Sequence, residues 1–413
     1  MNVNAHRATA AQAIPLEHDS GDGSLAARAQ KRRVCFLVRR LGLGGAERQL
    51  LELVRGLAER YEVSVLTFYA GGEIWEELRE CKAVELVALN KRGRWESIGF
   101  VRRLIRALNE RSPDIVHGYL PVANILALVS RRFVSSAPAI VWGIRTSNSR
   151  HETGDWLARL SFLAERVLCR YADLLIANSR AASIDFGSAK RVVYVPNGID
   201  SSRLYPDAAA RAEIRSEWSV PGSTPLIGLV ARIDPKKRHE LFLEAAAIYL
   251  EQFGNAQFVC VGRGAPSLEV SLKALAERLG IANAVVWAGA RSDMRGVYNA
   301  FDACTLCSNA AEGFPNVLAE AMACGVPCVT TDCGDAALIV GDQGVVIREH
   351  TPLGLARGWH EALGQERSVL SPVLQQRIAT DFSTATLTQR TIEQLEGLRS
   401  GREAKEVMTE RVR

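Results

Sequence analysis

The sequence feature that most constrains the fold is an alternation, repeated twice along the chain, of short apolar runs with longer stretches of helical periodicity. The runs are rich in β-branched residues, and the amphipathic stretches include residues 47–59 and 155–171. This alternation is typical of parallel, doubly wound α/β sheets. The expected strands are residues 34–38, 62–68, 84–89, 114–119, 139–144, 173–177 and 192–195, then 226–231, 257–262, 284–288, 303–307, 327–330 and 345–347.

The two series of strands divide the chain into halves of similar length. Pro196, Asn197 and Gly198 interrupt the pattern, and a polar stretch follows them. We expect a disordered tail at 1–30, a Rossmann-like N-terminal domain at 31–197, a Rossmann-like C-terminal domain at 198–382, and a helix and charged end at 383–413. Because ligands of such sheets bind beyond the carboxyl ends of the strands, the two domains are expected to face a central cleft.

Composition narrows the class of protein. The 413 residues are 47% hydrophobic and 23% charged, with a net charge of +5, as in ordinary globular proteins. The chain contains no long uncharged apolar run, and its first residues do not follow the pattern of a signal peptide, so a cytoplasmic location is expected. The cysteines lie mostly inside apolar runs. Cys304 and Cys307 have no second pair at zinc spacing, so we expect buried thiols and no metal site.

A glycine-rich loop follows the first expected strand. Gly42, Gly44 and Gly45 would let backbone N–H groups and a helix N-terminus approach a phosphate closely. The spacing is not that of a dinucleotide fingerprint, because Glu47 occupies the place of the third glycine. By itself the loop is compatible with a tight turn as well as with a phosphate site.

Two basic residues follow the first strand of the second series. Arg232 and Lys237 come just after residues 226–231, so we expect them at the carboxyl end of a strand, where a diphosphate could lie between them. A solvated turn with surface charges is the alternative interpretation.

The segment EGFPNVLAE, residues 312–320, places two carboxylates at the start of a helix. Pro315 suits the first turn of a helix that continues to Ala323. Glu312 then precedes the helix, and Glu320 lies roughly 6 Å along its axis. The nearly uncharged run between them indicates a half-buried helix, in which carboxylates need partners such as sugar or ribose hydroxyls.

These motifs together resemble family 4 of the retaining nucleotide-sugar glycosyltransferases, which have the GT-B fold. The most specific part is the Glu-x7-Glu element in its context EGFPNVLAEAMACGVPCV, and residues 113–117, 177–179, 195–200 and 261–264 also match family patterns. The resemblance spans about residues 33–399 and implies that residues 31–197 form the acceptor domain and residues 198–382 the nucleotide-sugar domain. It implies a metal-independent enzyme without a cofactor that moves a sugar from a nucleotide-diphosphate sugar to a glycan or lipid-linked acceptor, in polysaccharide or glycolipid biosynthesis.

The resemblance also implies roles for individual residues. Arg232 and Lys237 would hold the donor diphosphate, where leaving-group charge develops, Glu312 would contact the sugar, and Glu320 would hold the ribose. Further donor contacts are implied for Gly44, Gly45, Gly262, Gly313, Phe314, Pro315, Asn316 and Val317. The leaving phosphate would accept the proton of the acceptor. The chain has no Asp-x-Asp motif, which fits a reaction without a metal.

His117 lies near the end of the strand expected at 114–119. Two interpretations are open: a catalytic residue that contacts the sugar, and a histidine buried in the core. Relatives often carry further histidines where this chain has Tyr119 and Val122.

A basic helical stretch in the first half could rest on an anionic membrane surface at the inner face of the cell membrane, or could be a solvated face. Its arginines are Arg94, Arg102, Arg103 and Arg106. Nucleic acid is not an expected partner, because aromatic residues are few and no reader motif is present. Two other functions fit the same fold: a sugar-nucleotide epimerase and a non-catalytic nucleotide-sugar binding subunit.

Overall fold

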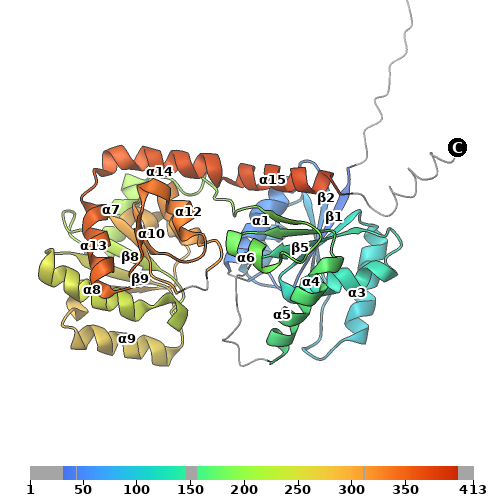
Figure 1. Cartoon of the computed structure of the whole chain (residues 1–413), viewed down its shortest axis with the longest axis horizontal. Coiled ribbons are helices and arrows are strands. Elements are labelled where there is room, and N and C mark those ends of the chain that lie inside the picture. Colours follow the sequence, from blue (N-terminus) through green and yellow to red (C-terminus); the bar gives the residue numbers. More distant parts are fainter. Residues whose placement is uncertain (1–30, 43, 146–155, 310–311, 399–413) are drawn as a thin grey trace, which may run out of the picture. The chain divides into compact units, whose positions relative to one another are not determined.

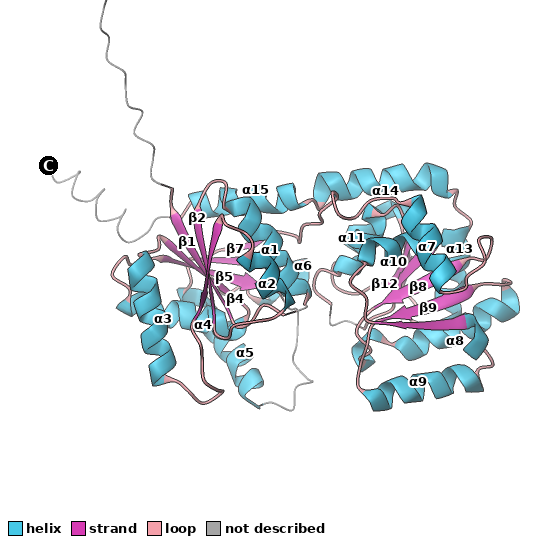
Figure 2. Cartoon of the chain, turned by 180° about the vertical axis from the view of Figure 1, so that it is seen from behind, coloured by secondary structure: helices cyan, strands magenta, loops and turns pink. Residues whose placement is uncertain are grey.

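The computed structural model describes residues 31–42, 44–145, 156–309 and 312–398. The tail expected at 1–30 and the charged end beyond 398 lie outside the described residues. The described chain forms two parallel sheets with helices on their faces (Figures 1 and 2). One sheet has seven strands in the order β3-β2-β1-β4-β5-β6-β7, and the other has six in the order β10-β9-β8-β11-β12-β13.

The first sheet and its helices come from the first half of the chain. Its strands are β1 (Arg33–Val38), β2 (Glu62–Thr67), β3 (Val84–Ala88), β4 (Ile115–Tyr119), β5 (Ala139–Ile144), β6 (Leu174–Ala177) and β7 (Val192–Tyr194). Its α-helices are α1 (Gly45–Leu57), α2 (Glu73–Arg79), α3 (Ile98–Arg111), α4 (Pro121–Ser130), α5 (Trp156–Leu168) and α6 (Arg180–Asp185).

The second sheet comes from the second half. Its strands are β8 (Leu226–Val230), β9 (Gln257–Val261), β10 (Val285–Gly289), β11 (Ala303–Leu306), β12 (Cys328–Thr331) and β13 (Val345–Ile347). The helices are α7 (Ala208–Glu217), α8 (His239–Gln252), α9 (Pro266–Arg278), α10 (Met294–Ala300), α11 (Asn316–Ala323), α12 (Ala336–Val340), α13 (Pro352–Leu363), α14 (Arg367–Asp381) and α15 (Thr384–Glu396).

Each expected strand is present, and only its ends differ. The strand expected at 226–231 ends at Val230, although the N–H of Ala231 still donates to the carbonyl of Val261 (3.0 Å). Most strand residues are apolar because a buried cluster lies on each face of each sheet. This confirms the two doubly wound α/β sheets predicted from the sequence.

The last helix of the described residues, α15, returns to the first half of the chain. The N–H of Ile199 donates to the carbonyl of Phe382 (2.7 Å), and the N–H of Thr384 donates to the carbonyl of Ile199 (3.2 Å), so the outgoing and returning segments pair as extended chains. Beyond this pair α15 packs along α1, whereas α14 packs on α11 (Figure 2). Leu387 and Leu395 of α15 therefore belong to the core of the first sheet.

Candidate functional site

The side chains of Asp234 and Cys307 fix the backbone of the loop after β8. Asp234 caps the 3₁₀ turn Pro235–Lys237 by accepting from the N–H of Lys236 (3.1 Å). The thiol of Cys307 donates to the carbonyl of Lys237 (3.2 Å), and burial raises the pKa of that thiol to about 12. Cys307 therefore stays protonated and supports the backbone of this loop.

Arg232 lies in this loop with its side chain 76% exposed, and its Nη2 is 3.2 Å from the carboxylate of Asp234. The neighbouring loop approaches it so closely that a Cβ at Gly262 would lie 2.0 Å from the carbonyl oxygen of Ala231. Gly262 also has a φ of +142°, which side chains disfavour. Gly262 thus has a structural reason to be glycine beside Arg232, separate from any contact with a donor.

Lys237 and Glu312, which are 75 residues apart in the sequence, form an ion pair. Both side chains are mostly buried, with 26% and 16% of their surface exposed. The structure therefore brings together two of the residues for which the motif predicts donor contacts, one from the loop after β8 and one from the segment before α11.

Asp335 and Gly334 fix the position of the segment that contains Glu312. The N–H of Asp335 donates to the carbonyl of Gly313 (3.0 Å), and the carboxylate of Asp335 accepts from the N–H of Arg180 (3.0 and 3.2 Å). A Cβ at Gly334 would lie 2.4 Å from the carbonyl oxygen of Glu312, and the φ of Gly334 is +53°. Gly334 is therefore required for this close approach.

Helix α11 begins one residue later than expected, because Pro315 is its N-cap rather than its first helical residue. Val317 is half-buried on the first turn, and the ring of Phe314 packs edge-on against Phe382 (5.5 Å between centroids). Inside the helix, Glu320 accepts a hydrogen bond from the hydroxyl of Tyr298 (2.5 Å). Burial raises the pKa of Glu320, and the hydrogen bond from Tyr298 opposes that shift.

An asparagine joins the first residue of α11 to the first half of the chain. The Nδ2 of Asn197 donates to Oδ1 of Asn316 (2.8 Å), and the Oδ1 of Asn197 accepts from Arg145 (3.3 Å) and Asn178 (3.4 Å). The loop of Asn197 is fixed because the side chain of Gln49 makes two 2.8 Å hydrogen bonds with the backbone of the next residue.

The glycine loop lies at the same place. A Cβ at Gly45 would be 3.2 Å from Nδ2 of Asn316, so the start of α1 and the start of α11 are in contact distance. Gly44 is the N-cap of α1, and the carboxylate of Glu47 folds back over it, with its pKa raised by burial. Two helix N-termini, which favour anions, therefore meet at one point.

Sequence reasoning missed three members of this network as site residues. Arg145, Asn178 and Asn197 each come directly or almost directly after a strand, at the carboxyl end where such sheets bind ligands. This position after a strand is the feature of the sequence that could have identified them as site residues. Arg145 is nearly buried, its guanidinium lies 4.6 Å above the ring centre of Tyr119, and its Nε and Nη2 have no hydrogen-bond partner among the described residues.

His117 does not face an open site. It is fully buried in the middle of β4, with its ring 4.7 Å from that of Phe36, and neither ring nitrogen has a hydrogen-bond partner among the described residues. Burial and then the charge of Arg145 lower the pKa of His117 to about 3, so the imidazole is neutral. The structure therefore places His117 in the core, which was the alternative to a sugar-contacting role.

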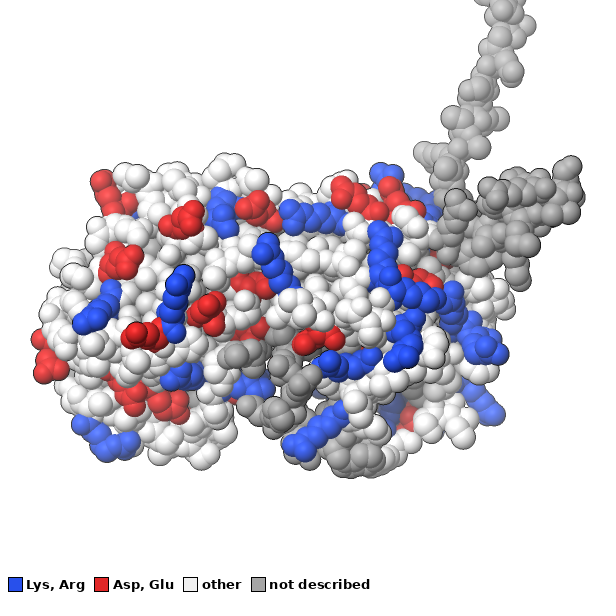
Figure 3. All heavy atoms as spheres, viewed as in Figure 1, with Lys and Arg blue, Asp and Glu red and all other residues white. Residues whose placement is uncertain are grey.

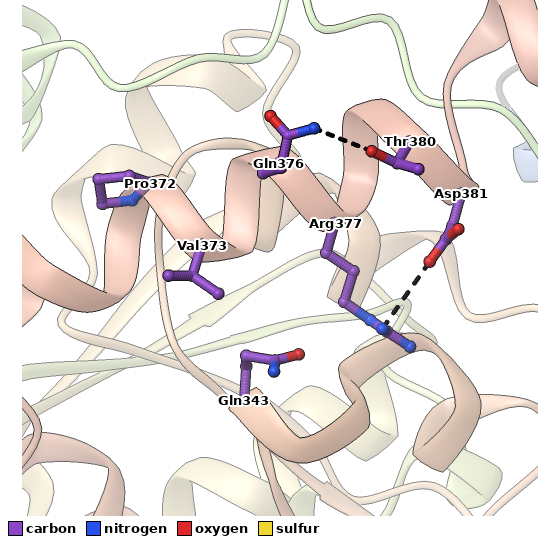
Figure 4. Close-up of a pocket in the computed structure, with 7 residues that line it drawn as sticks. All are labelled: Gln343, Pro372, Val373, Gln376, Arg377, Thr380 and Asp381. Atoms are coloured by element: carbon purple, nitrogen blue, oxygen red, sulfur yellow. Dashed lines mark hydrogen bonds and ion pairs between the residues drawn. The ribbon is translucent and has the colours of Figure 1, made fainter.

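A hollow in the described surface lies away from these residues (Figure 4). It is lined by α14 and the turn at Gln343, and it contains an ion pair between Arg377 and Asp381 (3.8 Å). None of the residues with an expected donor contact lines it. Among the described residues, no group of three or more His, Cys, Asp or Glu is placed to hold a metal ion.

Comparisons with known proteins show the family to which the chain is similar. Residues 43–203 match the family described as Glycosyltransferase Family 4, and residues 224–365 match the family described as Glycosyl transferases group 1. The chain is 27% identical over 314 residues to a putative glycosyltransferase, EpsF, of Bacillus subtilis, covering 74% of this chain and 80% of EpsF. It is 32% identical over 282 residues to a D-inositol 3-phosphate glycosyltransferase of Corynebacterium urealyticum, covering 62% and 63% of the two chains.

Solved structures show the same fold. The structure of Anabaena HepE in complex with UDP and glucose has a TM-score of 0.74 and 22% identity, covering 89% of this chain and all of HepE. WaaG, a glycosyltransferase involved in lipopolysaccharide biosynthesis, has a TM-score of 0.66 and 20% identity, covering 88% of this chain. The two parallel Rossmann-like sheets and these structural matches place the chain in the GT-B fold class. The chain belongs to the group 1, family 4 glycosyltransferases within that class.

Proposed function

We propose that the protein is a retaining, metal-independent glycosyltransferase that uses a nucleoside diphosphate sugar as donor and a glycan or lipid-linked molecule as acceptor. The observation that carries the proposal is the meeting of Lys237, Glu312 and the start of α11 beside the glycine loop. The UDP and UDP-glucose complexes of the structural neighbours support a nucleotide-sugar donor.

The basic residues would take the charge of the donor diphosphate. Among the described residues, the side chain of Arg232 pairs with Asp234 at the surface. Such pairs contribute about 0–1 kcal/mol, so its guanidinium can turn to a phosphate at little cost. Lys237 would exchange Glu312 for the diphosphate. Both cations would then stabilise the charge that grows on the leaving group in the transition state.

The two glutamates would hold the neutral parts of the donor. Once Lys237 turns to the diphosphate, the carboxylate of Glu312 can accept hydrogen bonds from sugar hydroxyls, and the N–H groups at the start of α11 can contact the phosphate. Glu320 would accept from the ribose, with Tyr298 fixing one of its oxygens. Epimerases of the same fold could bind such a donor as well, so binding alone does not test the proposal.

The reaction would proceed on one face of the sugar. The bond from the anomeric carbon to the phosphate oxygen breaks, the bond to the acceptor oxygen forms on the same face, and the leaving phosphate takes the acceptor's proton. The products are a nucleoside diphosphate and a glycoside with retained configuration.

The test is a panel of nucleotide sugars. A donor that binds the folded state raises the midpoint of thermal unfolding, and this donor is then incubated with glycan and lipid-linked acceptors. We expect release of nucleoside diphosphate and a product whose anomeric configuration, measured by NMR, equals that of the donor. An isomerised donor without release would indicate an epimerase, and stabilisation without turnover would indicate a binding subunit.

A further inference from the structure

Arg145, which directly follows β5, is a nearly buried cation. Many Lys and Arg side chains lie at the surface, as on the face drawn in Figure 3, where water surrounds their charge. By contrast, only 7% of Arg145 is exposed. Its Nη1 donates to the amide oxygen of Asn197 (3.3 Å), whereas its Nε and Nη2 are buried without a hydrogen-bond partner among the described residues. Because a buried cation without a counter-charge destabilises a fold, the burial of Arg145 indicates a functional role.

Arg215 is a second nearly buried arginine and shows what a structural role looks like in this chain. Only 4% of it is exposed. Its Nη1 bonds the carboxylate of Asp302 (3.1 Å), and its Nη2 donates to the backbone carbonyl of Pro221 (2.7 Å). A buried arginine that serves the fold is thus paired with an acid and with a carbonyl group. Arg145 has one long hydrogen bond to a neutral amide instead.

The side chains around Arg145 hold the guanidinium in place without neutralising it. The guanidinium carbon lies 4.6 Å from the ring centre of Tyr119, at the end of β4. Directly after β6, Oδ1 of Asn178 is buried and has no partner in the described part of the chain. Strands β4, β5 and β6 are adjacent in the sheet, and ligands bind beyond the carboxyl ends of such strands. Unpartnered polar atoms therefore gather at the edge of the sheet where this fold binds ligands.

Arg145 also lies beside the segment that is proposed to hold the sugar of the donor. A Cβ at Gly313, which follows Glu312, would be 3.9 Å from the carbonyl oxygen of Arg145. Asn197, which accepts from Arg145, donates to Asn316 at the start of α11 (2.8 Å). The guanidinium is therefore close to the sugar end of the proposed donor site, whereas the diphosphate is assigned to basic residues of the second half.

We propose that Arg145 is a specificity-determining residue that binds an anionic group of a substrate other than the donor diphosphate. The inference rests on the proposed transferase function and adds a substrate class to it. The group is a carboxylate of the transferred sugar, as in a nucleotide-activated uronic acid, or a carboxylate or phosphate of the acceptor.

The geometry of the guanidinium fits such a group. Nε and Nη2 of Arg145 lie on the same edge of the guanidinium, and this edge binds two oxygens of a carboxylate or phosphate through parallel hydrogen bonds. Because the site is nearly buried, little water competes for the pair. A neutral sugar would leave the cation without a counter-charge, so the site would select against it.

The first experiment compares the thermal unfolding of full-chain variants in a chloride buffer that lacks phosphate and carboxylates. Arg145→Met removes the uncompensated charge and fills a similar volume, so the midpoint should rise by about 2–4 °C. Arg215→Met, the matched control, removes the bonds to Asp302 and to the backbone, so its midpoint should fall. A fall for Arg145→Met as well would assign Arg145 a structural role and overturn the proposal.

The second experiment tests the transferred sugar as the carrier of the anion. Calorimetry compares UDP-glucose with UDP-glucuronate, and GDP-mannose with GDP-mannuronate. The parent should bind the uronate of one pair about tenfold more tightly than the neutral sugar, as expected for charge-assisted hydrogen bonds. Arg145→Met should bring this ratio to about one. Arg145→Lys keeps the charge but not the paired N–H groups, and its ratio should fall between the two.

The third experiment tests the acceptor as the carrier. In this case the parent should bind the two sugars of each pair with similar affinity. Inorganic phosphate is then titrated into protein saturated with UDP or GDP, which occupies the proposed diphosphate site. Phosphate should bind the parent about tenfold more tightly than Arg145→Met.

The proposal is overturned if neither the uronate preference nor phosphate binding depends on Arg145. It is also overturned if Arg145→Met loses affinity for UDP or GDP themselves, because the guanidinium would then bind the diphosphate. A parent that binds no nucleoside diphosphate contradicts the proposed transferase instead. Arg145 is then tested without nucleotide: phosphate should raise the unfolding midpoint of the parent more than that of Arg145→Met, and an equal rise would overturn the anion site.

Discussion

The ammonium of Lys237 is ion-paired with the carboxylate of Glu312. A donor diphosphate therefore has to compete with Glu312 for the ammonium. Glu312→Ala should bind free nucleoside diphosphate at least as tightly as the parent, because it removes this competitor. Its turnover should fall, since the carboxylate proposed to position the sugar is lost. Calorimetry with the diphosphate and steady-state kinetics measure the two effects, and weaker diphosphate binding would contradict the exchange.

Removing Lys237 or Arg232 should weaken the binding of nucleoside diphosphate, which is the opposite of the effect expected for Glu312→Ala. Lys237→Ala and Arg232→Ala should each lower kcat/KM by about 10²–10³-fold, as expected when a group that stabilises leaving-group charge is lost. Arg263→Ala, in the loop next to Arg232, is a matched control for the removal of one basic side chain. Near-normal turnover in folded Lys237→Ala and Arg232→Ala proteins would disprove the proposed diphosphate site.

Glu320 should contribute to donor binding rather than to the reaction step. Its proposed ribose contact is the same before and after transfer, so Glu320→Gln should raise KM for the donor and weaken nucleoside diphosphate binding by similar factors, with kcat nearly unchanged. Tyr298→Phe should give a smaller change in the same direction, because it removes the 2.5 Å hydrogen bond to Glu320. A large loss of kcat with unchanged KM would contradict this role.

Activity should survive chelation. No Asp-x-Asp motif is present in the chain, and Arg232 and Lys237 would supply the positive charge that a divalent ion supplies elsewhere. Turnover measured after dialysis against EDTA should equal that of the untreated protein. Loss of turnover that Mn²⁺ or Mg²⁺ restores would contradict it.

The buried Glu165 should make stability depend on pH. Burial raises its pKa from 4.5 to about 7, against the hydrogen bond from Asn124, which lowers it. A raised pKa means that the folded state favours the protonated form, so this contribution to stability is present below pH 4.5 and is lost as the pH rises through about 7. Glu165→Gln should therefore unfold with a free energy up to about 3 kcal/mol higher than the parent near pH 8. The difference should vanish toward the acid end of this window in urea titrations. An equal difference at both ends would contradict the assignment.

Gly198 should be needed where the chain crosses between the halves. A Cβ there would lie 2.8 Å from Cα of Thr384 and 3.0 Å from the carbonyl oxygen of Ser383. Gly198→Ala should lower the free energy of unfolding by about 1–3 kcal/mol, because these backbone atoms would have to move. Gly222→Ala is the matched control, since nothing lies within 4 Å of its Cβ position. Equal stability of the two variants would show that the returning segment adapts.

The sequence by itself determined the two sheets and the place of the motifs. Strands such as β1 and β8 are buried on both faces, so each appears as an unbroken apolar run, and the residues after such runs can be assigned to the carboxyl edge of a sheet. Arg232, Lys237 and the start of α11 could be placed in this way because short segments of sequence encode them.

Only the tertiary structure decided which of these groups meet. The pairs Lys237–Glu312 and Asn197–Asn316 join residues far apart in the sequence, and they depend on the order of the strands in the sheets and on the exact paths of the loops. The same holds for α15, whose periodicity predicts a helix but not its packing on α1. It also holds for His117, since a residue near the end of a strand can be buried or open depending on its neighbours. Periodicity in the sequence shows which face of a helix or strand is buried. Long-range packing decides which other helix or strand covers that face.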